Sequence, residues 1–218
     1  AVEEVRELSE QEACDLFAAM LDGGLPELEL GAVLALLGRR HLTLAELLGF
    51  HGAMAARSHR LSPPPAAARP VVLSSHGGAH AQPNLLPLLA LVLQRLGVPV
   101  LVHGALHGNG RVASAYIFRE LGVMPCASLT QAQGQLDERR MAFVPTAVLA
   151  PGLAQLLALR GRLGFDRTAA VVLKLLDPFA GDALLVVAGD DGAQRALLCD
   201  FMRLRGGSAL LLEGTEGE

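Results

Sequence analysis

Aromatic residues are scarce in this sequence. Its 218 residues include no Trp, one Tyr and seven Phe, so aromatics make up 4% of a chain that is 51% hydrophobic. Ala and Leu must therefore fill the interior, which favours helix-rich packing. Long apolar runs are also lacking, because the longest, LLPLLALVLQRLGVPVLV, is broken by Pro, Gln, Arg and Gly. We therefore expect no membrane-spanning helix.

Cysteine is scarce as well. Cys14, Cys126 and Cys199 are odd in number and far apart, which is the spacing of neither a disulfide framework nor a zinc site. We interpret them as reduced thiols in a cytoplasmic protein. No positively charged, apolar leader opens the sequence, so we predict no export signal. The chain begins without Met and ends at EGTEGE directly after a predicted strand, and we expect it to be truncated there.

Three widespread motifs are also missing. The sequence has no nucleophile elbow of the G-x-S-x-G form, no Walker-type GK[ST] and no full dinucleotide fingerprint. These absences argue against a hydrolase of the Ser-His-Asp type, a P-loop nucleotidase and a dinucleotide-dependent enzyme.

Basic residues are unevenly distributed, and nearly all of them are arginine. Of the 18 Lys and Arg residues only Lys174 is lysine, and arginine suits bidentate contact with phosphate. Residues 1–30 hold nine acids and one Arg, whereas residues 31–119 hold eight Arg, all seven His and a single acid, Glu46. The net charge of −4 therefore conceals a block of about +7, which suits polyanions. The alternative is a solvated face whose Arg stems cover apolar surface.

The sequence divides into a helical part and an alternating part. Residues 9–60 are predicted to be helical, with capping boxes that begin at Ser9 and Thr43. The stiff segment SPPPAAARP follows, so we predict a helical-bundle domain over 1–66 and an α/β domain over 67–218, truncated at its C-terminus. Candidate strands cover 71–74, 98–102, 142–145, 183–188 and 208–212, with a doubtful one near 123–126. Candidate helices cover 84–96, 111–121, 130–139, 150–163, 167–176 and 192–205. This alternation predicts a mainly parallel central sheet with helices on its faces.

Two glycine-bearing loops follow predicted strands, at the edge where ligands of parallel sheets bind. The first, SSHGGAHAQPN, ends at Asn84, which is a candidate helix N-cap. Paired glycines beside a helix start are typical of anion sites, although an ordinary strand-to-helix turn has the same pattern. The second loop, VHGALHGNGR, has glycines, imidazoles and an arginine that suit a phosphate or a nucleobase. Candidate residues in the two loops are Ser75, His76, Gly77, Gly78, Asn84, His103, Gly104, His107, Gly108, Asn109, Gly110 and Arg111.

Metal ligation is the weaker interpretation of these loops. Their histidines, His76, His80, His103 and His107, have no carboxylates nearby in the sequence, so we predict no metal site there. Glu213, Glu216 and Glu218 follow the last predicted strand, where carboxylates could hold Mg²⁺. Chain-end disorder is the alternative for that segment. Arg160, Arg162 and Arg167 are close in sequence and could reach an anion or lie at a solvated helix end.

The order of these pieces resembles the anthranilate phosphoribosyltransferase-like proteins, the fold of class III phosphoribosyltransferases and nucleoside phosphorylases (glycosyl transferase family 3). The resemblance runs from LFAAMLDGGLPELELGAVLALLG through HGGAH, VHG and GRLG to EGTEGE. It implies a small helical domain that dimerises, followed by an α/β domain of which a C-terminal portion is missing.

The resemblance also assigns the loops residue by residue. The family's GTGGD, which binds pyrophosphate, matches SSHGGAH, so Gly77 and Gly78 are kept and the acid is replaced. The N-x-S-T motif matches NLLP, which keeps Asn84 and puts Leu86 and Pro87 in place of the hydroxyls. The KHGNRS motif matches VHGALHGNGR, in which His103 and Gly104 are kept and Val102 replaces the lysine. Arg160 falls where the acceptor's carboxylate is bound. The paired Asp-Glu that binds a second Mg²⁺ is not reproduced in EGTEGE.

Departing pyrophosphate must be neutralised by Mg²⁺ and lysine, so these replacements argue against efficient transfer. The pattern is similar to the YbiB-type branch of the family, which binds nucleic acid without evident sequence preference. The first hypothesis is therefore a cytoplasmic, homodimeric DNA- or RNA-binding protein with no cofactor, no catalytic residue and no membrane contact. Its nucleic-acid contacts would be Arg39, Arg40, Arg57, Arg60, Arg69 and Arg111.

The alternative is a phosphoribosyltransferase or glycosyltransferase that acts on an altered acceptor with phosphoribosyl pyrophosphate and Mg²⁺. In it His103 assists the leaving pyrophosphate. Its pocket, which would otherwise be a vestigial phosphate site, would be lined by His76, Gly77, Gly78, Asn84, His103, Gly104, Arg111 and Arg160.

Overall fold

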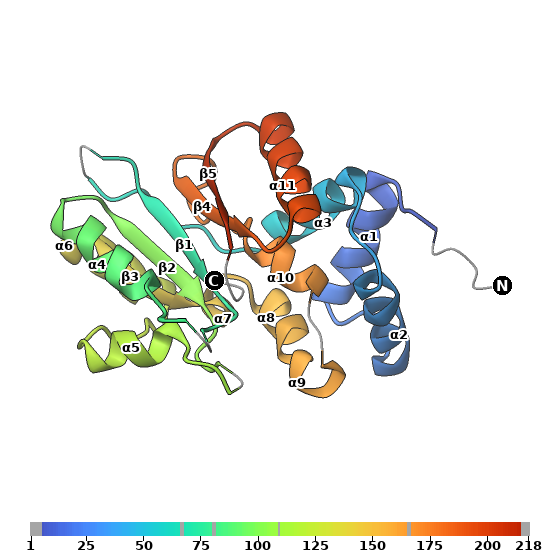
Figure 1. The fold of residues 1–218 in the computed structure, drawn as a ribbon, viewed down its shortest axis with the longest axis horizontal. Helices are drawn as coiled ribbons and strands as arrows, with labels where there is room; N and C mark the ends of the chain where they lie inside the picture. The colour runs from blue at the N-terminus through green and yellow to red at the C-terminus, as the bar shows by residue number, and fades with distance from the viewer. Residues whose placement is uncertain (1–5, 66–67, 80–81, 109, 165–166, 215–218) are drawn as a thin grey trace. The chain divides into compact units, whose positions relative to one another are not determined.

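The computed structural model describes residues 6–65, 68–79, 82–108, 110–164 and 167–214. These residues form two compact units, shown in Figure 1, and each unit is described by itself. The helical unit comprises residues 1–58 and 150–176, and the sheet unit comprises residues 59–149 and 177–218. The division predicted from the sequence, 1–66 and 67–218, differs from this one because the segment 150–176 clusters with the N-terminal helices.

The helical unit is built around the contact of its first and third helices. Both predicted capping boxes are confirmed: Ser9 and Thr43 each accept a hydrogen bond from the backbone three residues later. Phe17 and Phe50 stack with their ring centroids 4.8 Å apart. An added Cβ at Gly49 would lie 2.2 Å from the Glu10 carbonyl oxygen, so glycine permits this close approach. The helices are α1 (Glu10–Leu21), α2 (Glu27–Gly38), α3 (Leu44–Ala56), α8 (Pro151–Ala158), α9 (Arg160–Leu163) and α10 (Arg167–Leu173).

A fully buried carboxylate ties the start of the described chain to α3. Glu46 accepts hydrogen bonds from the backbone nitrogens of Leu8 (3.0 Å) and Thr43 (2.9 Å) and from both terminal nitrogens of Arg40. Burial would raise the pKa of Glu46, but the hydrogen bonds from Arg40 and from the backbone outweigh it, so its pKa lies below the ordinary value. Glu46 therefore stays ionised inside the unit.

The sheet unit contains a five-stranded parallel sheet in the order β3-β2-β1-β4-β5. The strands are β1 (Val71–Ser75), β2 (Val100–Gly104), β3 (Met141–Pro145), β4 (Leu184–Gly189) and β5 (Ser208–Glu213). All five predicted strands are confirmed, and the doubtful strand is wrong, because residues 123–126 are described and lie outside any strand. The connections contain α4 (Leu86–Arg95), α5 (Ser114–Glu120), α6 (Leu129–Arg139), the short α7 (Thr146–Leu149) and α11 (Gly192–Arg205).

One face of this sheet carries an apolar core. Alternate residues of β1, β2 and β3 project into it, among them Leu73, Val102 and Phe143. Helices α4 and α5 cover these strands through Ala90 and Phe118. Because the strands are parallel, the loops after β1 and β2 emerge at the same edge of the sheet. Within the described residues, none of the helices is long and apolar enough to cross a membrane.

Candidate functional site

Backbone hydrogen bonds join the two glycine-bearing loops into one wall at the carboxyl edge of the sheet. Ser75 and Gly104 are register partners at the ends of β1 and β2. The backbone nitrogen of Ala105, the residue after Gly104, donates to the Ser75 carbonyl at 3.1 Å. Further on, Ala79 and Val112 form an antiparallel bridge with N–O distances of 3.2 and 2.8 Å. The structure therefore brings together the two loops that the sequence singles out.

Packing of the backbone requires glycine at three positions in these loops. An added Cβ would lie 1.7 Å from the Ser75 carbonyl oxygen at Gly104 and 2.1 Å from the Arg111 carbonyl oxygen at Gly108. Gly78 has a φ of +65°, and its Cβ would lie 3.2 Å from that of Arg111. Arg111 therefore lies directly against the first loop. These glycines, all of them buried, keep the two loops close to one another.

Asn84 joins the two loops and does not cap a helix as predicted. Helix α4 begins at Leu86, and its N-cap position is Leu85. The Asn84 amide nitrogen instead donates to the Val112 carbonyl at 3.2 Å and lies 3.0 Å from Ser114 Oγ, while its oxygen accepts from the Leu86 nitrogen at 3.2 Å. The N-cap position lies one residue later than predicted, yet the Asn84 oxygen still bonds the first backbone nitrogen of α4. The partners of the amide nitrogen are 28 and 30 residues away.

His103 is fully buried, and neither of its ring nitrogens has a hydrogen-bond partner among the described residues. Burial, and secondly the neighbouring His76, lower its pKa from 6.5 to about 3. Ser74, the register partner of His103 on β1, and Thr146, just after β3, also have buried hydroxyl oxygens with no partner in the part of the chain that the structure describes. His103 is therefore a neutral imidazole at physiological pH, and it brings no positive charge to the site.

The positions that the resemblance assigns to reactive side chains hold packed apolar residues. Val102, which the resemblance sets against the lysine of KHGNRS, is fully buried in the sheet's core cluster together with Leu73 and Phe143. Leu86 packs against the same cluster, and Pro87 is buried. Val102, Leu86 and Pro87 contribute no charge and no hydroxyl to the carboxyl edge.

The arginines predicted to contact nucleic acid lie in different surroundings. Arg40 pairs with Glu46, and Arg57 pairs with Asp22 at 2.6 Å. The side chains of Arg39 and Arg60 are exposed, and no ion pair to either is present in the described part of the chain. The remaining two, Arg69 and Arg111, contact Ser208 Oγ and the first loop, respectively.

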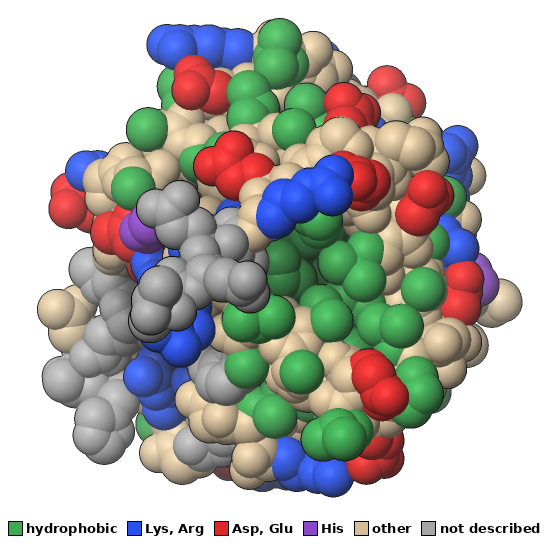
Figure 2. All heavy atoms as spheres, turned by 90° about the vertical axis from the view of Figure 1, so that its right-hand side faces the viewer, with side chains coloured by type: hydrophobic (Ala, Val, Ile, Leu, Met, Phe, Trp, Pro, Cys, Tyr) green, Lys and Arg blue, Asp and Glu red, His purple; other side chains and the backbone are tan. Residues whose placement is uncertain are grey.

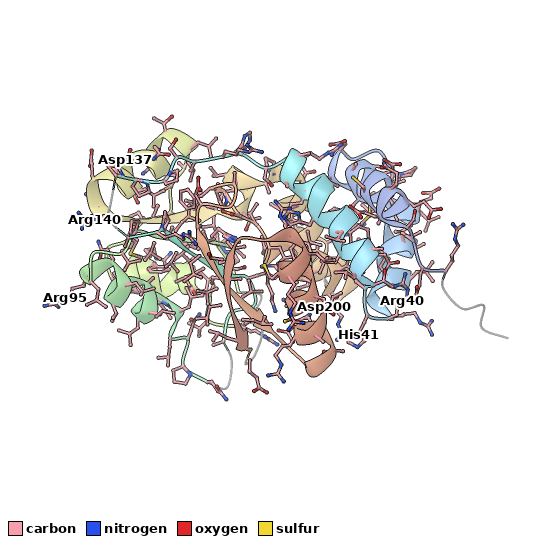
Figure 3. All side chains as sticks on the ribbon, turned by 90° about the horizontal axis from the view of Figure 1, so that it is seen from above. Arg40, His41, Arg95, Asp137, Arg140 and Asp200 are labelled. Carbon is pink, nitrogen blue, oxygen red and sulfur yellow. The ribbon has the colours of Figure 1, made fainter. Side chains whose placement is uncertain are left out.

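The face drawn in Figure 2 shows no continuous basic patch, because Lys and Arg side chains are interspersed there with Asp and Glu. Acids distant in sequence approach the arginines, which composition by segment does not reveal. Outside the predicted set, Arg95 and Arg140 point outward from the sheet unit, where Figure 3 also labels Asp137. Arginine at the last turn of a helix, as at Arg95, is an expected partner of the helix dipole and was a signal available in the sequence.

The other candidate residues are only partly described. Arg160 lies in α9 of the helical unit, whereas the two loops belong to the sheet unit. Its neighbour Arg162 pairs with Glu27 at 3.1 Å. Glu213 ends β5 and pairs with Arg195 at 3.3 Å. Among the described residues, no three His, Cys, Asp or Glu side chains are placed to hold a metal ion. His80, Asn109, Glu216 and Glu218 lie outside the described residues.

Comparison with known proteins agrees with this architecture. Residues 2–58 match the helical bundle domain of the glycosyl transferase family. The protein YbiB of Escherichia coli (strain K12) is 41% identical over 98% of this chain and 67% of its own length. An anthranilate phosphoribosyltransferase of Methylocella silvestris is 28% identical over 81% of this chain and 49% of its own length.

A solved structure extends the agreement to the fold. The anthranilate phosphoribosyltransferase of Thermus thermophilus superposes with a TM-score of 0.81 at 23% identity. That alignment covers 97% of this chain and 64% of the other, so the chain spans about two thirds of that enzyme. On the sequence match and the shared fold together, the chain belongs to the anthranilate phosphoribosyltransferase-like family.

Proposed function

We propose that this protein binds the phosphate groups of nucleic acid, without sequence preference, at its two joined loops, and that it does not transfer phosphoribosyl groups. The observation that carries the proposal is Val102. A family member with lysine at this position has a cation for departing pyrophosphate, whereas Val102 is fully buried among apolar residues. The backbone that approaches phosphate is thus kept, and the charge that drives transfer is lost.

The loops supply groups that can bind a phosphate without catalysing its transfer. Glycine-bearing turns after parallel strands are typical of anion sites, and Arg111, whose Cβ lies against Gly78, adds a permanent positive charge. The buried His103 adds none, because its pKa of about 3 keeps it neutral. Such contacts are made to the phosphate and not to the base, so they carry no sequence information.

Exposed arginines outside the loops would add contacts. Arg39 and Arg60 are exposed and available for phosphate contact. Arg40 and Arg57 contribute less than their charge suggests, because each would have to leave a carboxylate. Binding of this kind releases counterions and weakens linearly on a log–log plot against salt. The proposal therefore requires affinity that falls with salt and is the same for unrelated sequences.

Pairing of two copies would double the phosphate contacts. We propose the helical unit as the pairing surface, because α2 exposes Leu28 and Leu36, which are 82% and 47% accessible and lie on one side of the helix at a spacing of eight residues. Sedimentation equilibrium of the wild-type chain and of a Leu28→Glu variant tests this directly. A monomeric wild-type chain would contradict it.

Fluorescence anisotropy of labelled oligonucleotides tests the binding function. We expect binding that weakens with salt and is unchanged between oligonucleotides of unrelated sequence. Arg111→Gln is expected to weaken binding and to reduce the salt slope by about one phosphate contact. The control is Arg140→Gln, which removes an arginine from the opposite edge of the sheet, just before β3. No binding at low salt, together with Mg²⁺-dependent binding of phosphoribosyl pyrophosphate, would favour the transferase instead.

A further inference from the structure

We propose that His107, Tyr116 and Arg119 form a base-stacking site for single-stranded nucleic acid beside the second loop. The inference rests on the proposed function and specifies it, because it adds a contact to the base and a preference for unpaired strands. These three residues, called the stacking cluster below, lie in one loop and in the helix that directly follows it.

The geometry of the stacking cluster is set by α5. Tyr116 and Arg119 are one turn apart in this helix, and the guanidinium carbon of Arg119 lies 5.8 Å from the centre of the Tyr116 ring. The Tyr116 hydroxyl lies 3.5 Å from Nδ1 of His107, which belongs to the second loop. The Tyr116 backbone nitrogen donates to the Ala113 carbonyl at 3.0 Å and fixes the helix start against that loop. Two ring systems and a guanidinium plane thus lie together.

The stacking cluster is open to solvent on the loop side. His107 is exposed, and the side chain of Arg119 is 59% accessible. Tyr116 is half-buried, because part of its ring packs against the core cluster. Leu106 and Val112, which flank the loop, are 39% and 50% accessible. An exposed imidazole, a partly open ring and an apolar rim form a surface that one planar, uncharged partner can cover.

Structural explanations account for only part of this arrangement. Packing of Tyr116 against the core explains its buried edge, and its hydroxyl contact with His107 steadies the loop. Neither explains why Arg119 lies near the ring. Its ion pair with Glu120 is long, at 3.8 Å, and the Glu120 side chain is 79% exposed. A guanidinium above an aromatic ring is an arrangement on which planar bases also stack.

The position of the stacking cluster suits a nucleotide strand. The second loop also carries Arg111, four residues from His107, which lies against Gly78 in the proposed phosphate site. A strand whose phosphate is bound at Arg111 would contact the same loop that carries His107. Every base has a π-face, so stacking tolerates any sequence, which agrees with the absence of specificity in the proposed function. Bases in a duplex are already stacked, so the cluster would favour single strands.

The fluorescence of Tyr116 can report directly on whether a base covers its ring. It is the only Tyr and there is no Trp, so tyrosine emission comes from this one side chain. Titration with oligo(dT) is expected to quench that emission, after correction for absorbance with free N-acetyltyrosinamide. Titration with an abasic oligonucleotide of equal length is expected to leave it unchanged. Quenching of the tyrosine emission by both oligonucleotides would show that the Tyr116 ring is not covered by a base.

Substitution of the stacking cluster then measures its contribution by anisotropy. Arg119→Gln and His107→Ser are exposed changes that leave the core intact, and each is expected to weaken binding of oligo(dT). Tyr116→Leu is expected to weaken it by about fivefold to a hundredfold, the usual range for one stacked base, whereas Tyr116→Phe keeps the ring and the affinity. The control is Arg95→Gln, an exposed arginine at the far end of α4. A circular dichroism melt of each variant shows whether it is folded.

The outcomes separate the stacking cluster from the proposed function. Wild-type protein that binds oligo(dT) no better than the abasic strand or a duplex, with variants that bind equally well, would overturn the stacking site and leave phosphate binding in place. Wild-type protein that binds no oligonucleotide at low salt would overturn both. Loss of affinity for oligo(dT) in the variants, with unchanged affinity for the abasic strand, is the expected result.

Discussion

The buried imidazole of His103 makes the stability of the sheet unit dependent on acid. Its pKa is lowered from 6.5 to about 3 in the folded state, first by burial and then by the neighbouring His76. Between these two values the unfolded chain binds a proton that the folded chain does not. Stability therefore falls as the pH is lowered below 6.5, and this contribution levels off below about pH 3. Above pH 6.5 the imidazole is neutral in both states and adds no pH dependence.

The magnitude follows from the difference between the two pKa values. Each unit of pH below 6.5 costs about 1.4 kcal/mol, so the loss is about 2 kcal/mol at about pH 5. At the acid limit it reaches about 5 kcal/mol. Losses of this size are a large fraction of the stability of an ordinary domain. The loss of about 2 kcal/mol at about pH 5 is large enough to measure, and carboxylates are still ionised at that pH.

Urea unfolding followed by far-ultraviolet circular dichroism measures this effect. The free energy of unfolding of the wild-type protein and of His103→Gln is compared at neutral pH and at about pH 5. We expect the two proteins to differ in pH dependence by about 2 kcal/mol over this range, because the glutamine amide cannot take up the proton. His59→Gln removes an exposed histidine of the same unit and is expected to keep the wild-type dependence. Parallel curves for wild type and His103→Gln would refute a buried neutral imidazole.

Three further predictions concern packing and charge. Glu46→Ala leaves the partly buried Arg40 and two backbone donors without their acceptor. We therefore expect the free energy of unfolding in urea to fall by about 3 kcal/mol. A fall below about 1 kcal/mol would contradict the role of this carboxylate. Gly49→Ala places a Cβ 2.2 Å from the Glu10 carbonyl oxygen, so we expect it to destabilise the protein by about 1–3 kcal/mol. The Cβ of Gly52→Ala in the same helix meets nothing within 4 Å, so we expect this variant to be slightly more stable than wild type. Similar thermal melts for the two variants would refute the close contact between α1 and α3. Val102→Lys buries a charge in the sheet's core, so we expect a large drop in the melting temperature and no Mg²⁺-dependent binding of phosphoribosyl pyrophosphate. A stable variant that binds this ligand would contradict the assignment of Val102 to the core.

The elements could be predicted because their signals are local. Apolar runs bounded by turn residues indicated the five strands, and Ser9 and Thr43, each followed three residues later by Glu, indicated two helix starts. Errors arose where neighbours decided the outcome. Residues 123–126 have an apolar pattern and are not a strand, although the Cys126 nitrogen donates to the Phe143 carbonyl of β3 at 2.8 Å. The predicted helix over 150–163 is divided at Leu159 into α8 and α9.

The candidate site could be predicted in composition but not in arrangement. Glycines after two parallel strands were sufficient to place both loops at one edge, because parallel strands end on the same side. The role of Asn84 as a link between the loops was not predictable, since its partner Val112 is 28 residues away. The stacking cluster was missed because His107 and Tyr116, nine residues apart, meet only once the loop and α5 are folded.

The sequence by itself determined the helices, the parallel strands and the glycine-bearing loops. These follow from periodicity and residue type, which are properties of a short stretch of chain. Only the tertiary structure decided which charges are neutralised and which side chains are buried. Arg57 meets Asp22 across 35 positions, and His103 loses its charge through enclosure by distant residues. Electrostatic and desolvation energies depend on distance in space, and a linear sequence does not specify that distance.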